Sequence, residues 1–180
     1  MRKFTLAAAL LGALASVPAL AALSVGAKAP DFTTKAALGG KEFTFSLADA
    51  LKKGPVVLYF FPAAFTPGCT QEAHEFAEAS DKYAAQGATV IGVTAGNANR
   101  VTEFSSVECR NKFAVAADPD EKIIKSYDAV LKQKPEWADR TSYVIAPDGT
   151  ILLEYTNLDP SEHVTRTLAA VKKWRAEHKA

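Results

Sequence analysis

Two short continuous runs of apolar residues in the first half of the chain predict strands that are buried on both faces. The runs are residues 56–61 (VVLYFF) and residues 89–93 (TVIGV). Between them, Thr66 and Pro67 are typical of a helix start, because a capping hydroxyl is followed by a proline at the first helical position. Apolar residues continue at helical spacing to Gly87. The pattern therefore predicts a strand, helix and strand unit whose two strands are parallel.

Two hairpins are expected on either side of this unit. Gly39 and Gly40 form a two-residue loop that favours positive backbone dihedrals, and Pro147, Asp148 and Gly149 form a strong turn signal. The strands expected around these turns are residues 32–38, 41–46, 142–145 and 151–156.

Three further helices complete the pattern. Residues 99–108 carry apolar side chains at helical spacing. Asp118 and Asp159 are each followed by a proline and, three residues after the aspartate, by a glutamate, which predicts a capped helix start after each aspartate. The order of elements is that of an α/β protein with a thioredoxin-like fold: a central mixed β-sheet flanked by helices, with an N-terminal β-hairpin.

The N-terminus has the pattern of a secretory signal peptide. A basic head of residues 1–3 precedes an apolar stretch of residues 4–17, and Ala19-Leu20-Ala21 is a small-x-small cleavage site. The stretch is shorter than the roughly 20 residues of a membrane span, although a retained anchor stays the alternative. We therefore expect a signal peptide over residues 1–21, cleaved after Ala21, and one exported domain over residues 22–180, in the bacterial periplasm.

Composition and charge narrow the functional classes. The chain is 48% hydrophobic and 23% charged, typical of a globular protein, and its net charge of +1 gives no basic surface for nucleic acid. His74, His163 and His178 are scattered and pair with neither cysteine at a metal-ligand spacing. We expect no metal and no cofactor. The two cysteines are too few for a disulfide framework and indicate chemistry instead.

Cys69 is the strongest candidate for that chemistry. It ends the segment 62–69 (PAAFTPGC), between a buried strand and the first turn of a helix. Sites are commonly built beyond the carboxyl ends of parallel strands, and a first helical turn offers free N–H groups and a positive dipole end. This position favours the thiolate, which is the nucleophile. The alternative is a buried cysteine that acts as a small hydrophobic residue.

The spacing P-x-x-x-T-x-x-C, formed by Pro62, Thr66 and Cys69, resembles the active-site motif of the peroxiredoxins. The surrounding T-P-G-C-T-x-E is similar to the bacterioferritin-comigratory, or Q-type, branch, and Arg140 matches a family arginine before a late core strand. The resemblance runs from Ala29 to the final helix. It implies a thiol-dependent peroxidase that reduces hydrogen peroxide and organic hydroperoxides through a cysteine sulfenic acid.

The resemblance also implies roles for individual residues. Cys69 would attack the peroxide, and the departing oxygen needs donors for its developing charge. The Thr66 hydroxyl, the N–H groups of Gly68 and Cys69, and Arg140 would bind the substrate, with Arg140 also favouring the thiolate. Pro62 would shield the site from water.

Glu72 matches a family position that helps to hold the arginine. It lies three residues after Cys69, in the first turns of the predicted helix. A glutamate there is also what the helix dipole favours, so its role is less specific than that of Arg140.

Cys109 is the candidate resolving cysteine. A sulfenic acid condenses readily with a second thiol. Many Q-type members carry that thiol five residues after the first, where this chain has His74. Cys109 follows the predicted helix of residues 99–108, and some relatives have their resolving cysteine in the corresponding helix.

The expected geometry complicates this assignment. Cys69 starts one helix and Cys109 ends another, which predicts opposite ends of the sheet. A ten-residue helix spans about 15 Å, whereas bridged Cα atoms lie within about 7 Å. The bridge would need local unfolding. The alternatives are an inert Cys109 in a one-cysteine enzyme and a bridge between two chains.

The same residues leave two rival functions open and also indicate the expected binding partners. An exported thioredoxin-like thiol-disulfide oxidoreductase is the nearest rival, but Thr66 occupies the position of the first cysteine of a C-x-x-C motif. A redox-sensing or holdase domain is the non-enzymatic rival. The expected partners are a peroxide and a thioredoxin-like or other thiol reductant, with no nucleic acid, no membrane after signal removal, and a monomeric state.

Overall fold

The computed structural model describes residues 23–178, so the expected signal peptide of residues 1–21 lies outside the described residues. The strands are β1 (Thr33–Leu38), β2 (Lys41–Ser46), β3 (Val56–Phe60), β4 (Thr89–Thr94), β5 (Ala114–Ala117), β6 (Thr141–Ile145) and β7 (Ile151–Thr156). The helices are α1 (Leu47–Leu51), α2 (Pro67–Ala84), α3 (Val101–Val107), α4 (Lys122–Ser126) and α5 (His163–Glu177), with the 3-10 turns η1 (Ala98–Arg100) and η2 (Pro160–Glu162). Within residues 23–178, no helix is both long and apolar enough to cross a bilayer.

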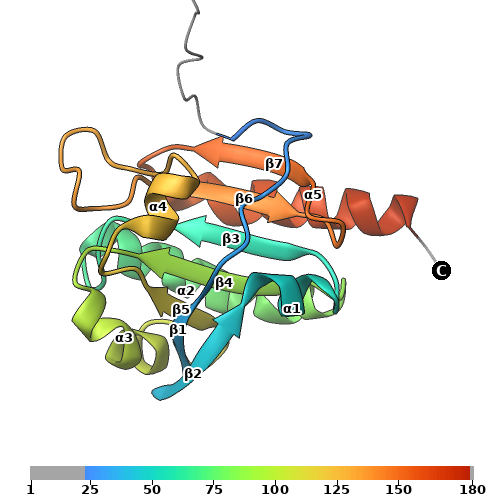
Figure 1. The fold of residues 1–180 in the computed structure, drawn as a ribbon. Coiled ribbons are helices and arrows are strands. Elements are labelled where there is room, and N and C mark those ends of the chain that lie inside the picture. Colours follow the sequence, from blue (N-terminus) through green and yellow to red (C-terminus); the bar gives the residue numbers. More distant parts are fainter. Residues whose placement is uncertain (1–22, 179–180) are drawn as a thin grey trace, which may run out of the picture.

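The strands form one mixed sheet in the order β2-β1-β5-β4-β3-β6-β7 (Figure 1). β3 is an interior strand next to the central β4, parallel to β4 and antiparallel to β6. Every residue of β3 is buried, because helices cover both faces of the sheet. The strand predicted to be buried on both faces and the predicted parallel strand, helix and strand unit are confirmed.

The predicted hairpins are also present. β1 and β2 pair antiparallel, and the loop residues Gly39 and Gly40 have φ angles of 57° and 75°. β6 and β7 pair antiparallel across the turn that contains Gly149, whose φ is 82°. These positive φ angles explain the glycines, since residues with a Cβ rarely adopt them.

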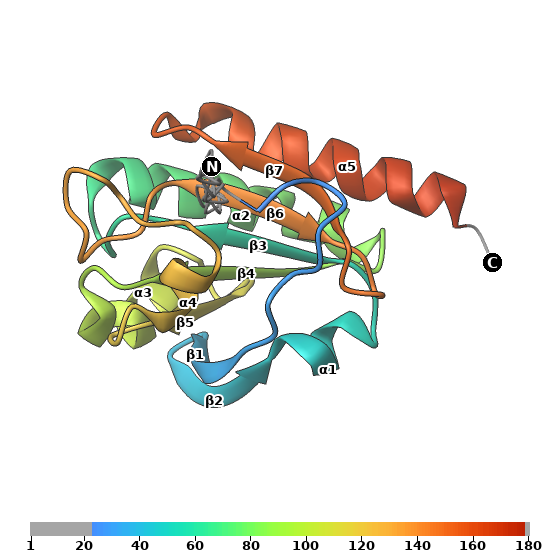
Figure 2. The same cartoon turned by 45° about the horizontal axis from the view of Figure 1, so that its top comes forward.

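Two hydrophobic cores lie on opposite faces of the sheet, and helices lie over both of these faces (Figure 2). Val57 and Tyr59 of β3 pack on the face covered by α2, α3 and α5. Leu58 and Phe60, with the opposite side-chain direction, pack on the face covered by α1 and α4. The alternation of a strand thus places Tyr59 on the same face as the N-terminus of α2, where Cys69 lies.

Three local features differ from the prediction. The sequence gives no indication of β5, whose four residues are mostly alanines, or of the one-turn helix α1. The helix predicted over residues 99–108 is the 3-10 turn η1 followed by α3. α4 starts at Lys122, not directly after Asp118, because Glu121 adopts a left-handed conformation with φ of 58°. Asp118 still accepts bonds from the free N–H groups of Ile123 and Ile124, both at 2.9 Å.

Candidate active site

The loop between β3 and α2 is fixed by contacts with the segment after β4. Ala63 pairs with Gly96 in a parallel bridge, and the Thr94 hydroxyl donates to the carbonyl of the buried Pro62 at 3.2 Å. A Cβ on Gly96 would lie 2.3 Å from the Pro62 oxygen, so only glycine permits this approach. Phe65 adopts a φ of 65°, which is unusual for a bulky residue. The loop is therefore held in one conformation just before Cys69.

Cys69 is the third residue of α2 and only 1% exposed. Thr66 occupies the N-cap position, as predicted, but its hydroxyl donates to the Ala63 carbonyl at 3.2 Å and does not cap the helix. The first helical bond runs from the Thr70 N–H to the Thr66 carbonyl. Within residues 23–178, the N–H groups of Gly68 and Cys69 have no acceptor, so both remain free for a ligand.

Arg140 reaches Cys69 from the start of β6. Its Nη2 lies 3.6 Å from the Cys69 Sγ, its Nη1 donates to Glu72, and its Nε donates to the Leu158 carbonyl at 2.9 Å. A Cβ on Gly68 would lie 3.1 Å from Nη2. The guanidinium is thus held in one orientation, and Gly68 leaves it the room to approach the thiol.

Glu72 lies one turn along α2 from Cys69 and is fully buried. Burial raises the pKa of its carboxyl to about 8, although the adjacent Arg140 acts in the opposite direction. Burial lowers the pKa of Arg140, but Glu72 and Cys69 outweigh it and the pKa is raised overall. The guanidinium is therefore a permanent cation between two acids.

His163 and Ser142 belong to the same buried cluster, and sequence reasoning missed both. His163 is fully buried, with Nδ1 at 2.8 Å from the Ser142 hydroxyl and Nε2 at 2.8 Å from the Asn157 carbonyl. Burial lowers the pKa of His163 to about 4. The available signal was its spacing with Thr167 and Val171, which places all three on the buried stripe of α5.

Cys109 does not lie at its predicted position. It is not at the far end of the sheet, because α3 has seven residues and spans only about 10 Å. Its neighbour Glu108 contacts His74 at 2.7 Å, and Arg110 contacts Glu78 at 3.2 Å. These α2 residues lie about 8 and 14 Å along the helix from Cys69. Cys109 thus lies beside the middle of α2.

The surroundings of Cys109 are apolar. The thiol is fully buried and, like Cys69, is a free cysteine in the core that contains Tyr59, Phe76 and Phe104. Burial, with a smaller contribution from Glu108, raises the pKa of the Cys109 thiol far above its usual range. Cys109 is therefore protonated in this structure at neutral pH.

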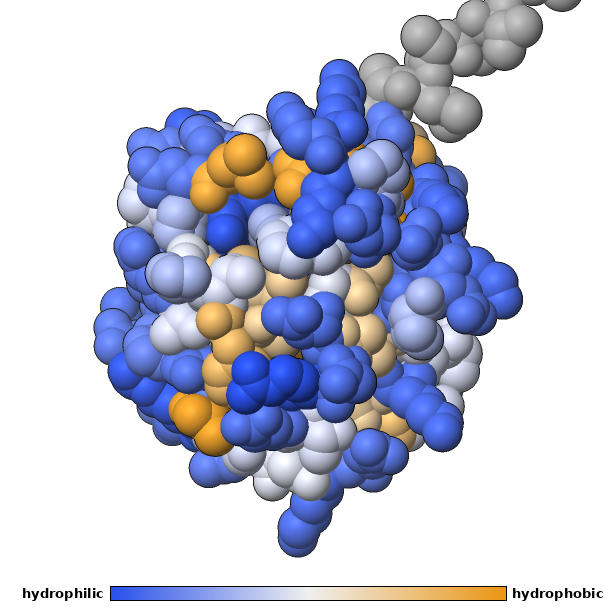
Figure 3. All heavy atoms as spheres, turned by 90° about the vertical axis from the view of Figure 1, so that its left-hand side faces the viewer, coloured by the Kyte–Doolittle hydropathy of each residue, from blue (hydrophilic) through white to orange (hydrophobic). Residues whose placement is uncertain are grey.

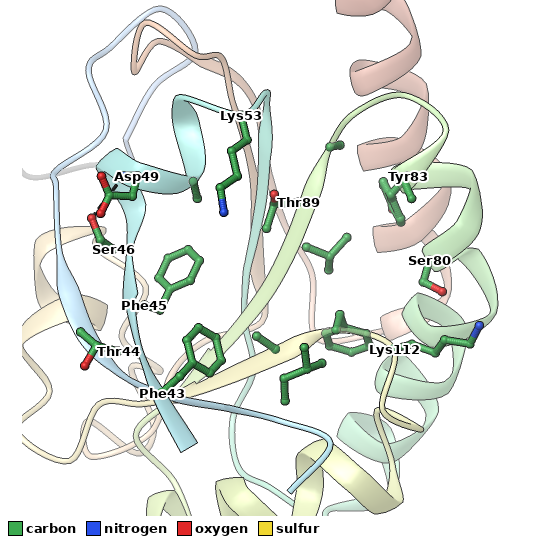
Figure 4. Close-up of a pocket in the computed structure, with 17 residues that line it drawn as sticks. Phe43, Thr44, Phe45, Ser46, Asp49, Lys53, Ser80, Tyr83, Thr89 and Lys112 are labelled. Atoms are coloured by element: carbon green, nitrogen blue, oxygen red, sulfur yellow. Dashed lines mark hydrogen bonds between the residues drawn. The ribbon is translucent and has the colours of Figure 1, made fainter. Parts of the chain in front are cut away.

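Several surface cavities lie away from Cys69. A cavity of about 530 Å³ opens between β2, α1 and the C-terminal half of α2, with Phe43 and Phe45 pointing into it (Figure 4). None of the residues around Cys69 lines it. At the opposite end, where β3 ends, small apolar patches lie among hydrophilic side chains (Figure 3). Residues 23–178 contain no group of three or more side chains arranged to hold a metal.

Comparisons with known proteins agree with this arrangement. The AhpC/TSA family model matches residues 25–153. Chloroplastic peroxiredoxin Q of Triticum aestivum is 33% identical over 151 residues, covering 83% of this chain and 67% of that protein. Peroxiredoxin Bcp of Bacillus subtilis is 30% identical over 157 residues, covering 83% and 96%.

The fold comparison leads to the same family. The crystal structure of peroxidoxin BcpB from Mycobacterium tuberculosis superimposes with a TM-score of 0.75 at 26% identity, covering 84% of this chain and 97% of that one. The sheet and its flanking helices are those of the thioredoxin-like fold that the sequence predicts. The chain belongs to the AhpC/TSA family and is a thiol-dependent peroxidase of the peroxiredoxin type.

Proposed function

We propose that Cys69 is the thiol that attacks the peroxide and that hydrogen peroxide and organic hydroperoxides are both substrates. The observation that carries this proposal is the buried Cys69 sulfur at the N-terminus of α2, 3.6 Å from Arg140 Nη2. A helix N-terminus and a guanidinium both stabilise the thiolate. Cys109 has neither and is fully buried.

The thiolate forms a bond to one peroxide oxygen while the O–O bond breaks. The products are a sulfenic acid on Cys69 and an alkoxide or hydroxide, which takes up a proton to become an alcohol or water. Arg140 and the free N–H groups of Gly68 and Cys69 are placed to stabilise the charge on the departing oxygen. The Thr66 hydroxyl donates to Ala63, which leaves its oxygen able to accept a hydrogen bond from the peroxide.

Resolution by Cys109 is the second part of the proposal. The Cys109 thiol condenses with the Cys69 sulfenic acid to give a disulfide and water, and a thioredoxin-like or other thiol reductant then reduces the disulfide. The separation along α2 exceeds the span of a disulfide, so the segment around Cys109 must leave α2 first. The exposed pair of Arg110 and Glu78 is weak enough to allow this opening.

Export to the bacterial periplasm as a monomer completes the proposal. Export is supported by the signal-peptide pattern of residues 1–21. Secretion of a reporter fused to residues 1–21, and the mass of the purified domain in solution, test the two parts separately.

The decisive experiment combines turnover with mass spectrometry. Reduced wild-type protein, Cys69→Ser and Cys109→Ser receive one equivalent of hydrogen peroxide or of an organic hydroperoxide, with and without thiol donors. We expect no peroxide consumption by Cys69→Ser, a wild-type monomer lighter by two hydrogens, and a sulfenic acid on Cys69 in Cys109→Ser. A free Cys109 beside an oxidised Cys69 in the wild type would refute resolution by Cys109.

The rival functions give different outcomes. Rapid reduction of insulin without peroxide consumption would identify a thiol-disulfide oxidoreductase. Suppression of aggregation that persists in Cys69→Ser, without any peroxidase activity in the wild type, would identify a holdase. Either result overturns the assignment of Cys69 as a peroxide-reactive thiol.

A further inference from the structure

Two buried side-chain oxygens have no hydrogen-bond partner among residues 23–178: the Tyr59 hydroxyl and Glu72 Oε1. Glu72 uses Oε2 to accept from Arg140, whereas its Oε1 is buried and unpaired among residues 23–178. The Nδ1 of His163 lies 3.8 Å from this Oε1. A carboxylate oxygen without a donor is costly in a fully buried position.

The hydrogen bonds of His163 define which of its nitrogens carries the proton. Nε2 faces the Asn157 carbonyl, which can only accept, so Nε2 is the N–H donor. Nδ1 of the neutral ring is then an acceptor, and it faces the Ser142 hydroxyl and Glu72 Oε1. Two acceptors therefore face each other, unless a proton lies between them. A proton on Oε1 could be donated to Nδ1 if the two side chains moved less than about 1 Å closer together. The Ser142 hydroxyl does not prevent this, because it can rotate away from Nδ1.

The charges in the cluster lead to the same conclusion. Within the described part of the chain, Arg140 is the single cation in contact with two acids, Cys69 and Glu72. If both acids were ionised, a net negative charge would be buried in a site whose residues are at most 4% exposed. Ionisation of one acid thus opposes ionisation of the other.

The surrounding titratable groups do not supply a second cation. The groups that face Glu72 or its partners are Cys69 and Glu75 on α2, Tyr59 on β3, Arg140 before β6, Asp159 before η2, and His163 and Arg166 on α5. Arg166 is half exposed and paired with Glu162, and Glu75 adds a further negative charge. Burial of Glu72 raises the pKa of its carboxyl to about 8, which agrees with a proton held at neutral pH.

We propose that Glu72 is a protonated carboxylic acid when Cys69 is a thiolate, and that His163 is a positioning residue that holds this acid proton through Nδ1. The inference rests on Cys69 being the peroxide-reactive thiol. The site converts a Cys69 thiol and a Glu72 carboxylate into a Cys69 thiolate and a Glu72 acid, with no change in net charge. When the thiolate becomes a neutral sulfenic acid, Glu72 ionises again, and its proton balances the one taken up by the departing alkoxide.

Infrared difference spectroscopy tests the proton directly. Cys109→Ser is the background, because it leaves Cys69 as the single cysteine. We expect the C=O stretch of a protonated carboxylic acid in the reduced protein at neutral pH, its loss when iodoacetamide alkylates Cys69, and its absence in Glu72→Gln. Glu75→Gln, on the same helix, is the matched control and must retain the band. No acid band at a pH where ultraviolet absorbance shows the thiolate would overturn the proposal.

The ultraviolet titration of the Cys69 thiolate provides a second readout. Glu72→Gln mimics the neutral acid, so the midpoint of the titration should move by less than about half a pH unit, which is a threefold change in the acid dissociation constant. A midpoint that falls by more than about one unit would mean that Glu72 is ionised first in the wild type, and a rise of that size would mean that the carboxylate charge supports the thiolate. Either result refutes the proposal.

Substitution of His163 tests its positioning role. His163→Leu removes the acceptor for the acid proton, which favours ionised Glu72 and should raise the thiolate midpoint by about one unit, or tenfold. His178→Leu, on the exposed end of α5, is the control. A purely structural His163 would lower the unfolding temperature without moving the midpoint. If His163→Leu does not fold, the infrared band and Glu72→Gln still decide the protonation state.

The outcomes separate this inference from the proposed function. Peroxide treatment followed by mass spectrometry shows whether Cys69 is oxidised at all. An unreacted Cys69 refutes the proposed function, whereas an oxidised Cys69 without the acid band refutes only the inference about Glu72.

Discussion

The two cysteines differ in electrostatic surroundings and not in burial. Cys69 is 1% exposed and Cys109 is fully buried, and both belong to the core under α2 and α3. Cys69 has Arg140 at 3.6 Å and the free N–H groups of a helix start, whereas Cys109 has apolar neighbours and the acidic Glu108. The comparison teaches that a buried thiol becomes a candidate nucleophile only where the fold supplies donors for its anion.

Substitution of Arg140 should have the largest effect on the difference in reactivity between Cys69 and Cys109. Arg140→Met keeps the side-chain length but removes the cation, so we expect the rate of Cys69 oxidation by hydrogen peroxide to fall by about 10²- to 10³-fold. Stopped-flow measurement of the first turnover reports this rate. Arg166→Met, which removes an exposed arginine paired with Glu162, is the control and should change the rate little. A wild-type rate in Arg140→Met would show that the helix N-terminus is sufficient.

The polar surroundings of Cys69 should also make stability depend on pH. The pKa of His163 is lowered from 6.5 to about 4 in the folded protein. The unfolded state therefore binds the proton first, and stability is lost as pH falls from about 6.5 towards 4, by up to about 3 kcal/mol. Glu72 has the opposite sign, because its raised pKa reduces stability as pH rises from 4.5 to about 8.

Urea unfolding of the wild type and His163→Gln across this pH range isolates the histidine. The stability of the wild type relative to His163→Gln should decrease towards acidic pH. A difference that is constant with pH would contradict a neutral buried imidazole.

A smaller effect should come from substitution of Gly68, whose missing Cβ leaves space for the Arg140 guanidinium. In Gly68→Ala the new Cβ lies 3.1 Å from Nη2, so the guanidinium must shift by a few tenths of an ångström. We expect about a tenfold slower first turnover, together with a stability that is unchanged or raised by up to about 1 kcal/mol, since alanine favours a helix over glycine. Peroxide kinetics and thermal unfolding of the same sample check both parts. Slower turnover with a matching loss of stability would indicate general damage instead.

The smallest predicted effect concerns the segment that carries Cys109. His74 and Glu108 are joined at 2.7 Å, with side-chain exposures of 35% and 16%, and such a pair contributes up to about 1 kcal/mol. His74→Ala should therefore speed disulfide formation after peroxide addition by up to about fivefold, because the segment leaves α2 more easily. Quenched-flow alkylation and mass spectrometry measure this rate. Lys112→Ala, which removes an exposed contact with Asp81 further along α2, is the control.

Much of the site could be predicted because its chemistry is local. The buried strand before the loop, the proline at the first helical position and the cysteine two residues later all lie within residues 56–69. Their consequence, a thiol at a helix N-terminus, needs no distant contact. Arg140 was identified through the family motif, and the structure places it against Cys69 from 71 residues away.

Other features could not be predicted because they depend on packing between distant segments. β5 is a run of small residues that is a strand only because it fills the place between β1 and β4. Cys109 was expected at the far end of the sheet, and the short α3 and the contacts of Glu108 and Arg110 with α2 place it nearer. The lengths of the loops and helices could be predicted from the sequence, but the directions of these elements in space could not.

The sequence by itself determined the parallel strand, helix and strand unit, the two hairpins and the position of Cys69 at a helix start, since short-range patterns encode all three. Only the tertiary structure decided how many charges share the buried site. Glu72, Arg140 and His163 come from α2, the start of β6 and α5, and each is ordinary in its own segment. Their protonation states depend on distance and burial, which arise only when these three elements pack together.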